Sequence, residues 1–104
     1  MFLIQMLLPT RTPADESAAA GKLRQTRAEI VSHFGGVTAY VRSPAAGAWT
    51  SPDGNVERDD VVMIEILAGT FDREWWRHYV ETLKQRFSQD SIHVRATPVE
   101  TLDD

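Results

Sequence analysis

The sequence contains no cysteine in its 104 residues. This absence excludes disulfides, thiol nucleophiles and thiolate metal sites, and it leaves the redox compartment undetermined. The three histidines share no short spacing, and neither H-x-x-x-H nor H-E-x-x-H occurs, so we expect no metal site. A glycine-rich phosphate-binding loop is also missing. We therefore expect a protein without a bound cofactor.

Positive charge and long apolar runs are scarce as well. Lys and Arg number 11 against 15 Asp and Glu, giving a formal net charge of -4, so no basic field attracts nucleic acid. The N-terminal apolar run, MFLIQMLLP, is too short to span a bilayer. It also lacks the basic region and small-residue cleavage site of a signal peptide. We expect this run to be a strand, and the protein to be cytoplasmic with no nucleic-acid or membrane partner.

What remains is the composition of an ordinary globular protein. Hydrophobic residues make up 42% of the chain and charged residues 25%. A chain of this length forms one domain with one small core. We expect this domain to span residues 1–104, with a loosely held tail from about Pro98.

The stretch VERDDVVMIEIL, from Val56 to Leu67, predicts a central strand because it is rich in β-branched residues. Side chains alternate between the two faces of a strand. One face carries Val62, Ile64 and Ile66, and the other carries Val61, Met63, Glu65 and Leu67. Glu65 therefore lies in the middle of the strand, on the face opposite the isoleucines.

Two amphipathic helices are predicted. Thr12 and Pro13 are suited to begin the first helix, and Gly35-Gly36 to end it. Thr70 or Asp72 begins the second, which runs to about Phe87. Apolar residues recur near the helical period in both, giving buried stripes of Ala19, Leu23, Ile30 and Phe34 in the first and Trp76, Val80, Leu83 and Phe87 in the second.

Three more strands complete the prediction, over residues 2–8, 37–43 and 91–97. The order β-α-β-β-α-β predicts an α+β, ferredoxin-like two-layer sandwich with both helices on one face. Strands 2–8 and 56–67 would be central. The segment 44–55, which includes a turn signal at Ser51-Pro52-Asp53-Gly54, predicts an extended hairpin between the two middle strands, with Trp49 near its projecting tip.

The sheet face that the helices leave open is expected to be half apolar and half polar. Its predicted members are Leu3, Gln5, Leu7, Thr38, Tyr40, Arg42, Met63, Glu65, Leu67, His93, Arg95 and Thr97. A face left to water is normally more polar than this. We therefore expect a partner to cover it, as in a homodimer whose two sheets stack face to face.

Two interpretations of this open face stay open. In the first it is an interface with satisfied ion pairs, Glu65 pairing with Arg42 and His93 with Gln5. In the second it holds a small-ligand cavity, where Glu65 or His93 accepts a proton. The anion-binding and hydrogen-bonding candidates in that cavity are Arg42, Arg95, Tyr40 and Gln5.

The first interpretation predicts a homodimeric binding or interaction module. The second allows a cofactor-independent isomerase or small oxygenase acting on a hydrophobic metabolite. His33, at a helix end, and His78, on a helix surface, are expected to be structural. Trp75 and Trp76 must point about 100° apart, so one is core and Trp75 is either a contact site or partly covered by its neighbours.

The second half of the chain resembles a family of small bacterial proteins of uncharacterised function. The matching stretches are Trp49-Thr50-Ser51-Pro52-Asp53-Gly54, Arg58-Asp59 and Lys84-Gln85-Arg86-Phe87-Ser88-Gln89-Asp90-Ser91. The resemblance implies a ferredoxin-like fold and transfers no catalytic residue. Independently of it, Gln89, Asp90 and Ser91 are suited to a helix-to-strand turn. The alternative is a polar site formed by Arg86, Gln89 and Asp90.

Overall fold

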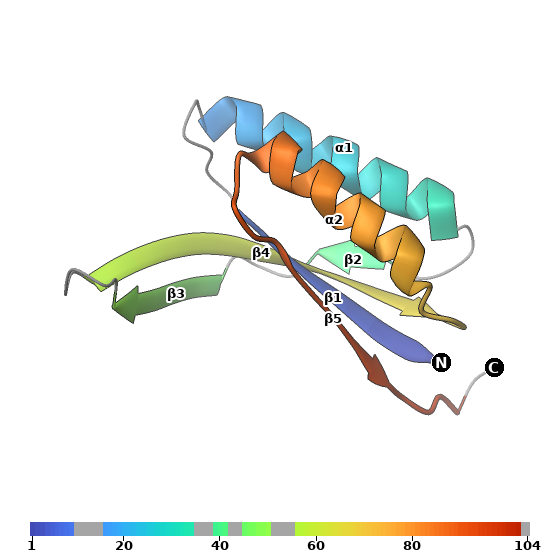
Figure 1. The fold of residues 1–104 in the computed structure, drawn as a ribbon. Coiled ribbons are helices and arrows are strands. Elements are labelled where there is room, and N and C mark those ends of the chain that lie inside the picture. The colour runs from blue at the N-terminus through green and yellow to red at the C-terminus, as the bar shows by residue number, and fades with distance from the viewer. Residues whose placement is uncertain (10–15, 35–38, 42–44, 51–55, 103–104) are drawn as a thin grey trace.

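The computed structural model describes residues 1–9, 16–34, 39–41, 45–50 and 56–102. The strands and helices follow the expected order along the chain, with one additional strand, β3, between the two helices (Figure 1). Their bounds are β1 Phe2–Pro9, α1 Glu16–Phe34, β2 Ala39–Val41, β3 Ala45–Thr50, β4 Val56–Ala68, α2 Arg73–Phe87 and β5 His93–Pro98. The predicted α+β class, with an antiparallel sheet and two helices, is confirmed.

The strands form one antiparallel sheet in the order β2-β4-β1-β5, with β3 paired to β4 as well. β1 and β4 are therefore central, as predicted. Their register places Gln5 opposite Glu65, and β5 places Arg95 opposite Gln5 on the other side. Three strands thus bring three polar residues into one row across the sheet.

The segment between the two middle strands contains an additional strand. Residues 45–50, which fall within the predicted extended hairpin, form strand β3, which pairs with β4 from Ala45 opposite Val61 to Thr50 opposite Val56. β4 is 13 residues long, so one of its edges has room for β2 near one end and β3 near the other. The paired strands β3 and β4 extend beyond the helices (Figure 1). The predicted turn at 51–54 lies outside the described residues.

Helix α2 has a capping residue at each end. The side chain of Asp72 accepts a hydrogen bond from the Trp75 amide at 3.1 Å, so Asp72, one of the two predicted starts, is the N-cap. Ser88 ends the helix with a left-handed backbone conformation, φ 54°. The Gln89 amide then donates to the Lys84 carbonyl at 2.9 Å, which satisfies a carbonyl that the helix leaves unpaired.

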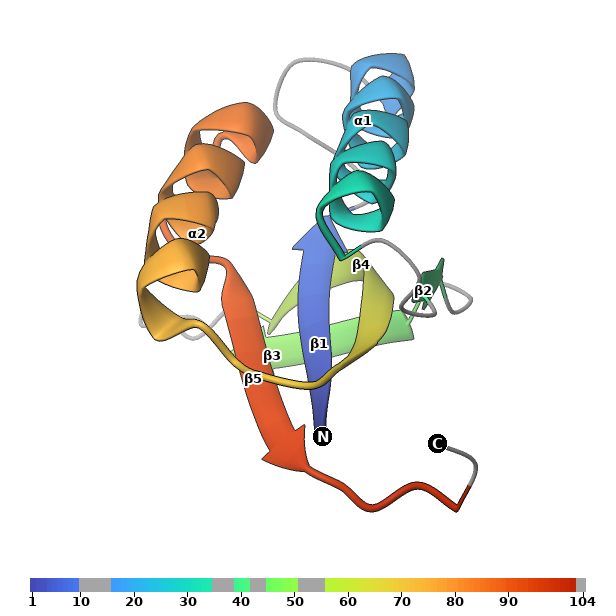
Figure 2. The same ribbon diagram turned by 90° about the vertical axis from the view of Figure 1, so that its right-hand side faces the viewer.

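Both helices pack on the same face of the sheet (Figure 2). That face carries the even-numbered residues of β1 and β4, as predicted for Val62, Ile64 and Ile66. The two predicted helical stripes also face the core, with Thr26 as an additional buried member of the α1 stripe. The fully or nearly buried core residues are Ile4, Met6, Leu8, Ile30, Val62, Ile64, Ile66, Ala68, Trp76, Leu83, Phe87 and Ile92.

The last strand and the tail also depart slightly from expectation. β5 begins at His93 rather than Ser91 and includes Pro98. Beyond it, the Val99 amide donates to the Met1 carbonyl at 2.9 Å, so the chain is still tied to the N-terminus at this point. No helix among the described residues is both long and apolar enough to cross a membrane.

Candidate functional site on the open sheet face

A row of hydrogen-bonded polar side chains crosses the sheet face that the helices leave open. Nε of Arg95 on β5 donates to Oε1 of Gln5 on β1 at 2.7 Å. Nε2 of Gln5 then donates to Oε1 of Glu65 on β4 at 3.0 Å. The two bonds fix the orientation of the Gln5 amide, with its oxygen toward the arginine and its nitrogen toward the carboxylate. We call Arg95, Gln5 and Glu65 the polar row.

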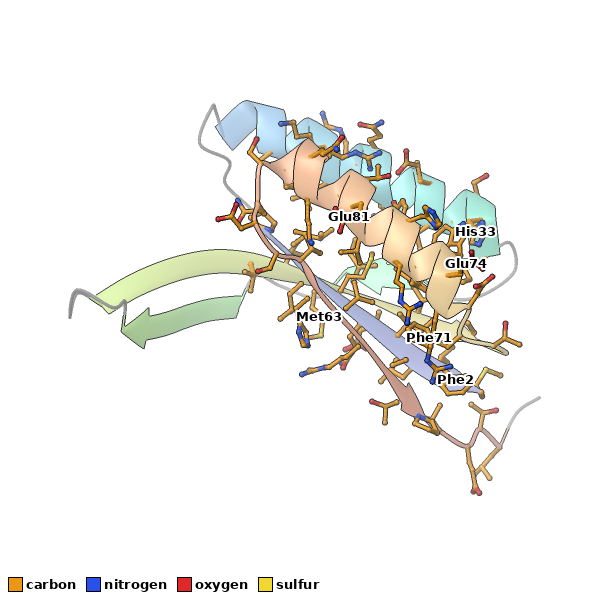
Figure 3. The ribbon with its side chains drawn as sticks, in the orientation of Figure 1. Phe2, His33, Met63, Phe71, Glu74 and Glu81 are labelled. Carbon is orange, nitrogen blue, oxygen red and sulfur yellow. The ribbon has the colours of Figure 1, made fainter. Side chains whose placement is uncertain are left out.

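Glu65 is buried although no helix lies over it. It is 1% exposed, whereas Arg95 at the other end of the polar row is exposed. Nε2 of Gln5 also lies 3.4 Å from Sδ of Met63, so an apolar side chain borders the row. Figure 3 shows Met63 on the side of the sheet away from the helices. A carboxylate in such surroundings must be hydrogen-bonded, since burying an uncompensated charge is costly.

Apolar side chains flank the polar row along the central strands. Leu3, Leu7, Met63 and Leu67 are each half-buried on the open face. In the sheet register Leu3 lies opposite Leu67, and Leu7 opposite Met63. The arrangement is therefore two apolar cross-strand pairs with the Gln5–Glu65 pair between them. Chemically, it offers a carboxylate that can accept a proton and, at the row's exposed end, a guanidinium that can bind an anion.

The structure brings together only some of the predicted site residues. His93 lies opposite Leu7 and not beside Gln5, so the predicted pairing of these two residues is wrong. Tyr40 is the backbone partner of Glu65 on β2, but its side chain lies outside the described part of the chain, as do all of Arg42 and Thr38. Among the described residues, no group of three His, Asp or Glu side chains could hold a metal ion.

A second polar cluster, which sequence reasoning missed, joins the two helices. Arg86 on α2 contacts both carboxylate oxygens of Glu29 on α1, at 2.7 and 2.9 Å. The same guanidinium donates to Oγ1 of Thr26 at 2.8 Å, and the Tyr79 hydroxyl donates to Glu29 at 2.9 Å. We call these four residues the helix clamp. The hydrogen bond from Arg86 lowers the pKa of Glu29, and burial, followed by the bond to Glu29, raises the pKa of Tyr79.

The helix clamp had a weak signal in the sequence. Tyr79 and Arg86 are seven residues apart, and Thr26 and Glu29 three apart, so each pair shares one side of its helix. These contacts argue against the alternative polar site of Arg86, Gln89 and Asp90, because the Arg86 side chain binds Thr26 and Glu29 on α1. The Gln89 side chain instead donates to the Phe87 carbonyl at 3.1 Å, a local structural role.

Aromatic rings cover Trp75. The His33 ring stacks on it with centroids 3.9 Å apart, and Tyr79 stacks on it at 4.9 Å. Trp75 is consequently half-buried, which favours partial cover by its neighbours over an exposed contact site. The Nδ1 atom of His78 lies 2.9 Å from the Glu74 carbonyl on the same helix.

These features define the class of the molecule as a small α+β protein with two helices on one face of an antiparallel sheet. No family model and no curated protein matches the sequence. Solved structures do resemble it, among them CutA1 from Pyrococcus horikoshii, with a TM-score of 0.55 and 14% identity over 100% of this chain and 88% of that one. The structure of CutA from the same organism in guanidine hydrochloride has a TM-score of 0.54 and 15% sequence identity, over 99% of this chain and 88% of that chain.

A phage SAM lyase in complex with S-methyl-5'-thioadenosine has a similar shape. Its TM-score is 0.56 at 15% identity, over 92% of this chain and 79% of that chain. At such identities the likeness concerns the fold alone, and function has to be argued from the site itself.

Proposed function

We propose that this chain is a cytoplasmic, ferredoxin-like interaction module that forms a homodimer through its open sheet face. The observation that carries the proposal is the two apolar cross-strand pairs, Leu3–Leu67 and Leu7–Met63, which stay only half-buried on the face that no helix covers. Two observations support the ferredoxin-like assignment. The fold is similar to that of CutA1, and the order of elements is β-α-β-β-α-β with one additional strand, β3. The motifs at Trp49 and Lys84 support membership of the small bacterial family that the second half resembles.

A second copy of the chain is a suitable cover for this face. A twofold dimer brings the same patch of both subunits together, so the patch must complement itself. The open face meets this requirement because its apolar pairs, Leu3–Leu67 and Leu7–Met63, can pack on their own copies in a second chain. If two copies stack through their open faces, a small-ligand cavity between the two sheets would lie beside the polar row.

Sedimentation velocity tests the proposal. The wild type should sediment with twice the 11.7 kDa chain mass. Met63→Arg, which places a charge in the centre of the face, should yield a monomer with an unchanged circular dichroism spectrum. Val31→Arg is the matched control, because Val31 is 45% exposed on α1, away from the open face. A monomeric wild type, or dimers in all three proteins, would contradict the proposal.

The second candidate function is a cofactor-independent isomerase or small oxygenase acting on a hydrophobic metabolite. The observation that favours it is a buried carboxylate bordered by apolar side chains, the setting in which a general base is tuned. A ligand screen of wild type and Glu65→Gln tests it, with S-methyl-5'-thioadenosine, the molecule bound by the phage SAM lyase, as the first probe. Equal binding of every ligand by both proteins, together with equal conversion of every bound ligand, would exclude Glu65 as a catalytic residue.

A further inference from the structure

A groove of about 580 Å³ lies on the opposite side of the sheet from the polar row, along helix α2 and above the edge strand β5. Its apolar lining consists of Phe71, Trp76, Val80 and Val94. Trp76 is 3% exposed and the other three are half-buried, so the lining is continuous with the core. Figure 3 shows Phe71 at the start of α2 and Glu81 farther along it, which marks the direction of the groove.

Two arginines line the same groove. Arg73 and Arg77 are one helical turn apart on α2, and both are exposed. Within the described residues neither forms an ion pair, and the nearby acidic lining residue, Glu81, is paired with Lys84 at 3.0 Å. Positive charges in the first turns of a helix oppose the helix dipole. The groove therefore has a positive end, formed by two arginines that have no ion-pair partner among the described residues.

The guanidinium of Arg73 lies over the ring of Phe71, with its central carbon 5.7 Å from the ring centroid. Stacking on an aromatic face holds the side chain in place, and it leaves the N–H groups at the edge of the guanidinium available to an acceptor. An arginine held in this way favours a planar, two-oxygen anion such as a carboxylate.

We propose that this groove binds a small apolar carboxylate, whose aromatic or aliphatic body lies on Val80 and Val94, above the buried Trp76, and whose carboxylate is held by Arg73 and Arg77. The lining suits both halves of the ligand. An inorganic anion would leave the apolar wall uncovered, and a neutral apolar molecule would gain no charge-assisted hydrogen bond from the arginines. A ligand site on the helix side of the sheet is independent of self-association through the open face.

Naphthoate is the probe for this site, and neutral naphthalenemethanol is its matched partner. We expect naphthoate to shift the amide proton–nitrogen correlation signals of Trp76, Val80 and Val94 in a saturable way. Naphthalenemethanol should bind at least about 10-fold more weakly, a difference of about 1.4 kcal/mol. The double variant Arg73→Gln, Arg77→Gln should lose naphthoate affinity by a similar factor. Arg27→Gln, the same change on the exposed side of α1, should bind as the wild type does.

Three results would each overturn the proposal. One is naphthoate binding that does not saturate by about 10 mM, far weaker than a specific site provides. Another is equal affinity for the acid and the alcohol, and the third is an unchanged affinity in the double variant. Repeating the titration with Met63→Arg separates this inference from the proposed dimer, since the groove should bind naphthoate equally well in a monomer.

Discussion

Glu65 is the residue whose role depends most on what surrounds it. Its position in the middle of β4 puts it on the open face, where a carboxylate is normally solvated, yet it is 1% exposed. The neighbouring strand supplies a donor, Gln5, which is itself held by Arg95. A buried hydrogen bond to a charged group contributes more than one between neutral groups. The polar row should therefore contribute to stability whether or not it binds a ligand.

Replacing Glu65 tests this contribution. Glu65→Gln keeps the shape of the side chain but removes the charge that accepts the hydrogen bond from Gln5. We expect a loss of about 1–3 kcal/mol in the free energy of unfolding, measured by urea denaturation. Glu100→Gln, the same change at an exposed position in the C-terminal segment, should have no measurable effect. Equal stability of both variants and the wild type would show that the carboxylate contributes nothing to folding.

The pKa of Glu29 predicts a pH dependence. The hydrogen bond from Arg86 lowers this pKa below the ordinary value of 4.5, so the unfolded chain takes up the proton at a higher pH than the folded protein does. The stability contributed by the helix clamp is therefore complete above about pH 4.5 and is lost as the pH falls through the lowered pKa. The Glu29 side chain is 39% exposed, so solvent screening limits the size of this contribution.

Melting curves of wild type and Glu29→Gln at a series of pH values measure this effect. The wild type should melt at the higher temperature at neutral pH, and the difference should shrink steadily below pH 4.5. Glu81→Gln serves as the comparison, since its pair with Lys84 is exposed and should contribute little at any pH. A difference between wild type and Glu29→Gln that stays constant down to acidic pH would contradict the assignment.

At the scale of elements, helix α2 serves three surfaces at once. One side, including Leu83, packs on the sheet, a second, with Tyr79 and Arg86, contacts α1, and a third, with Arg73 and Arg77, lines the groove. The 3.6-residue period makes this division possible, because residues a few positions apart point in different directions. The apolar side is the one that determines whether the helix stays in place.

Leu83→Ala tests that dependence. Leu83 is 0% exposed at the centre of the buried stripe, and a buried Leu→Ala change costs about 2–5 kcal/mol. The loss should appear as a lower denaturation midpoint with the same slope. Gln85→Ala, at an exposed position of the same helix, should leave the midpoint close to that of the wild type. A loss below about 1 kcal/mol for Leu83→Ala would mean that this side of α2 is not the core side.

At the scale of the whole molecule, the two faces of the sheet differ in structure. The helix-covered face contains the core and the groove, and the open face contains the polar row. If the open side is a dimer interface, the melting temperature of the wild type should rise with protein concentration, because association stabilises only the folded chain. The melting temperature of Met63→Arg should not depend on concentration. A concentration-independent wild type would agree with a monomer and would contradict the proposed dimer.

The sequence by itself determined the features that depend on local periodicity. Alternation in β4 assigned Ile64 to the core and Glu65 to the other face, and the helical period located Leu83 in the stripe. Asp72 was one of two candidate N-caps, because its side chain can accept a hydrogen bond from a backbone amide in the first turn of the helix. Such signals involve residues close together in the chain, so no knowledge of distant segments is needed.

Only the tertiary structure decided which distant residues meet. A shift of two residues between β1 and β5 leaves every side chain on the same face, so alternation could not show that Arg95, and not His93, lies beside Gln5. The same holds for Arg86, whose partner Glu29 is 57 positions away in the sequence on another helix. Register and helix packing are set by the fit of the whole core, and for that reason the polar row, the helix clamp and the groove appear only in the folded molecule.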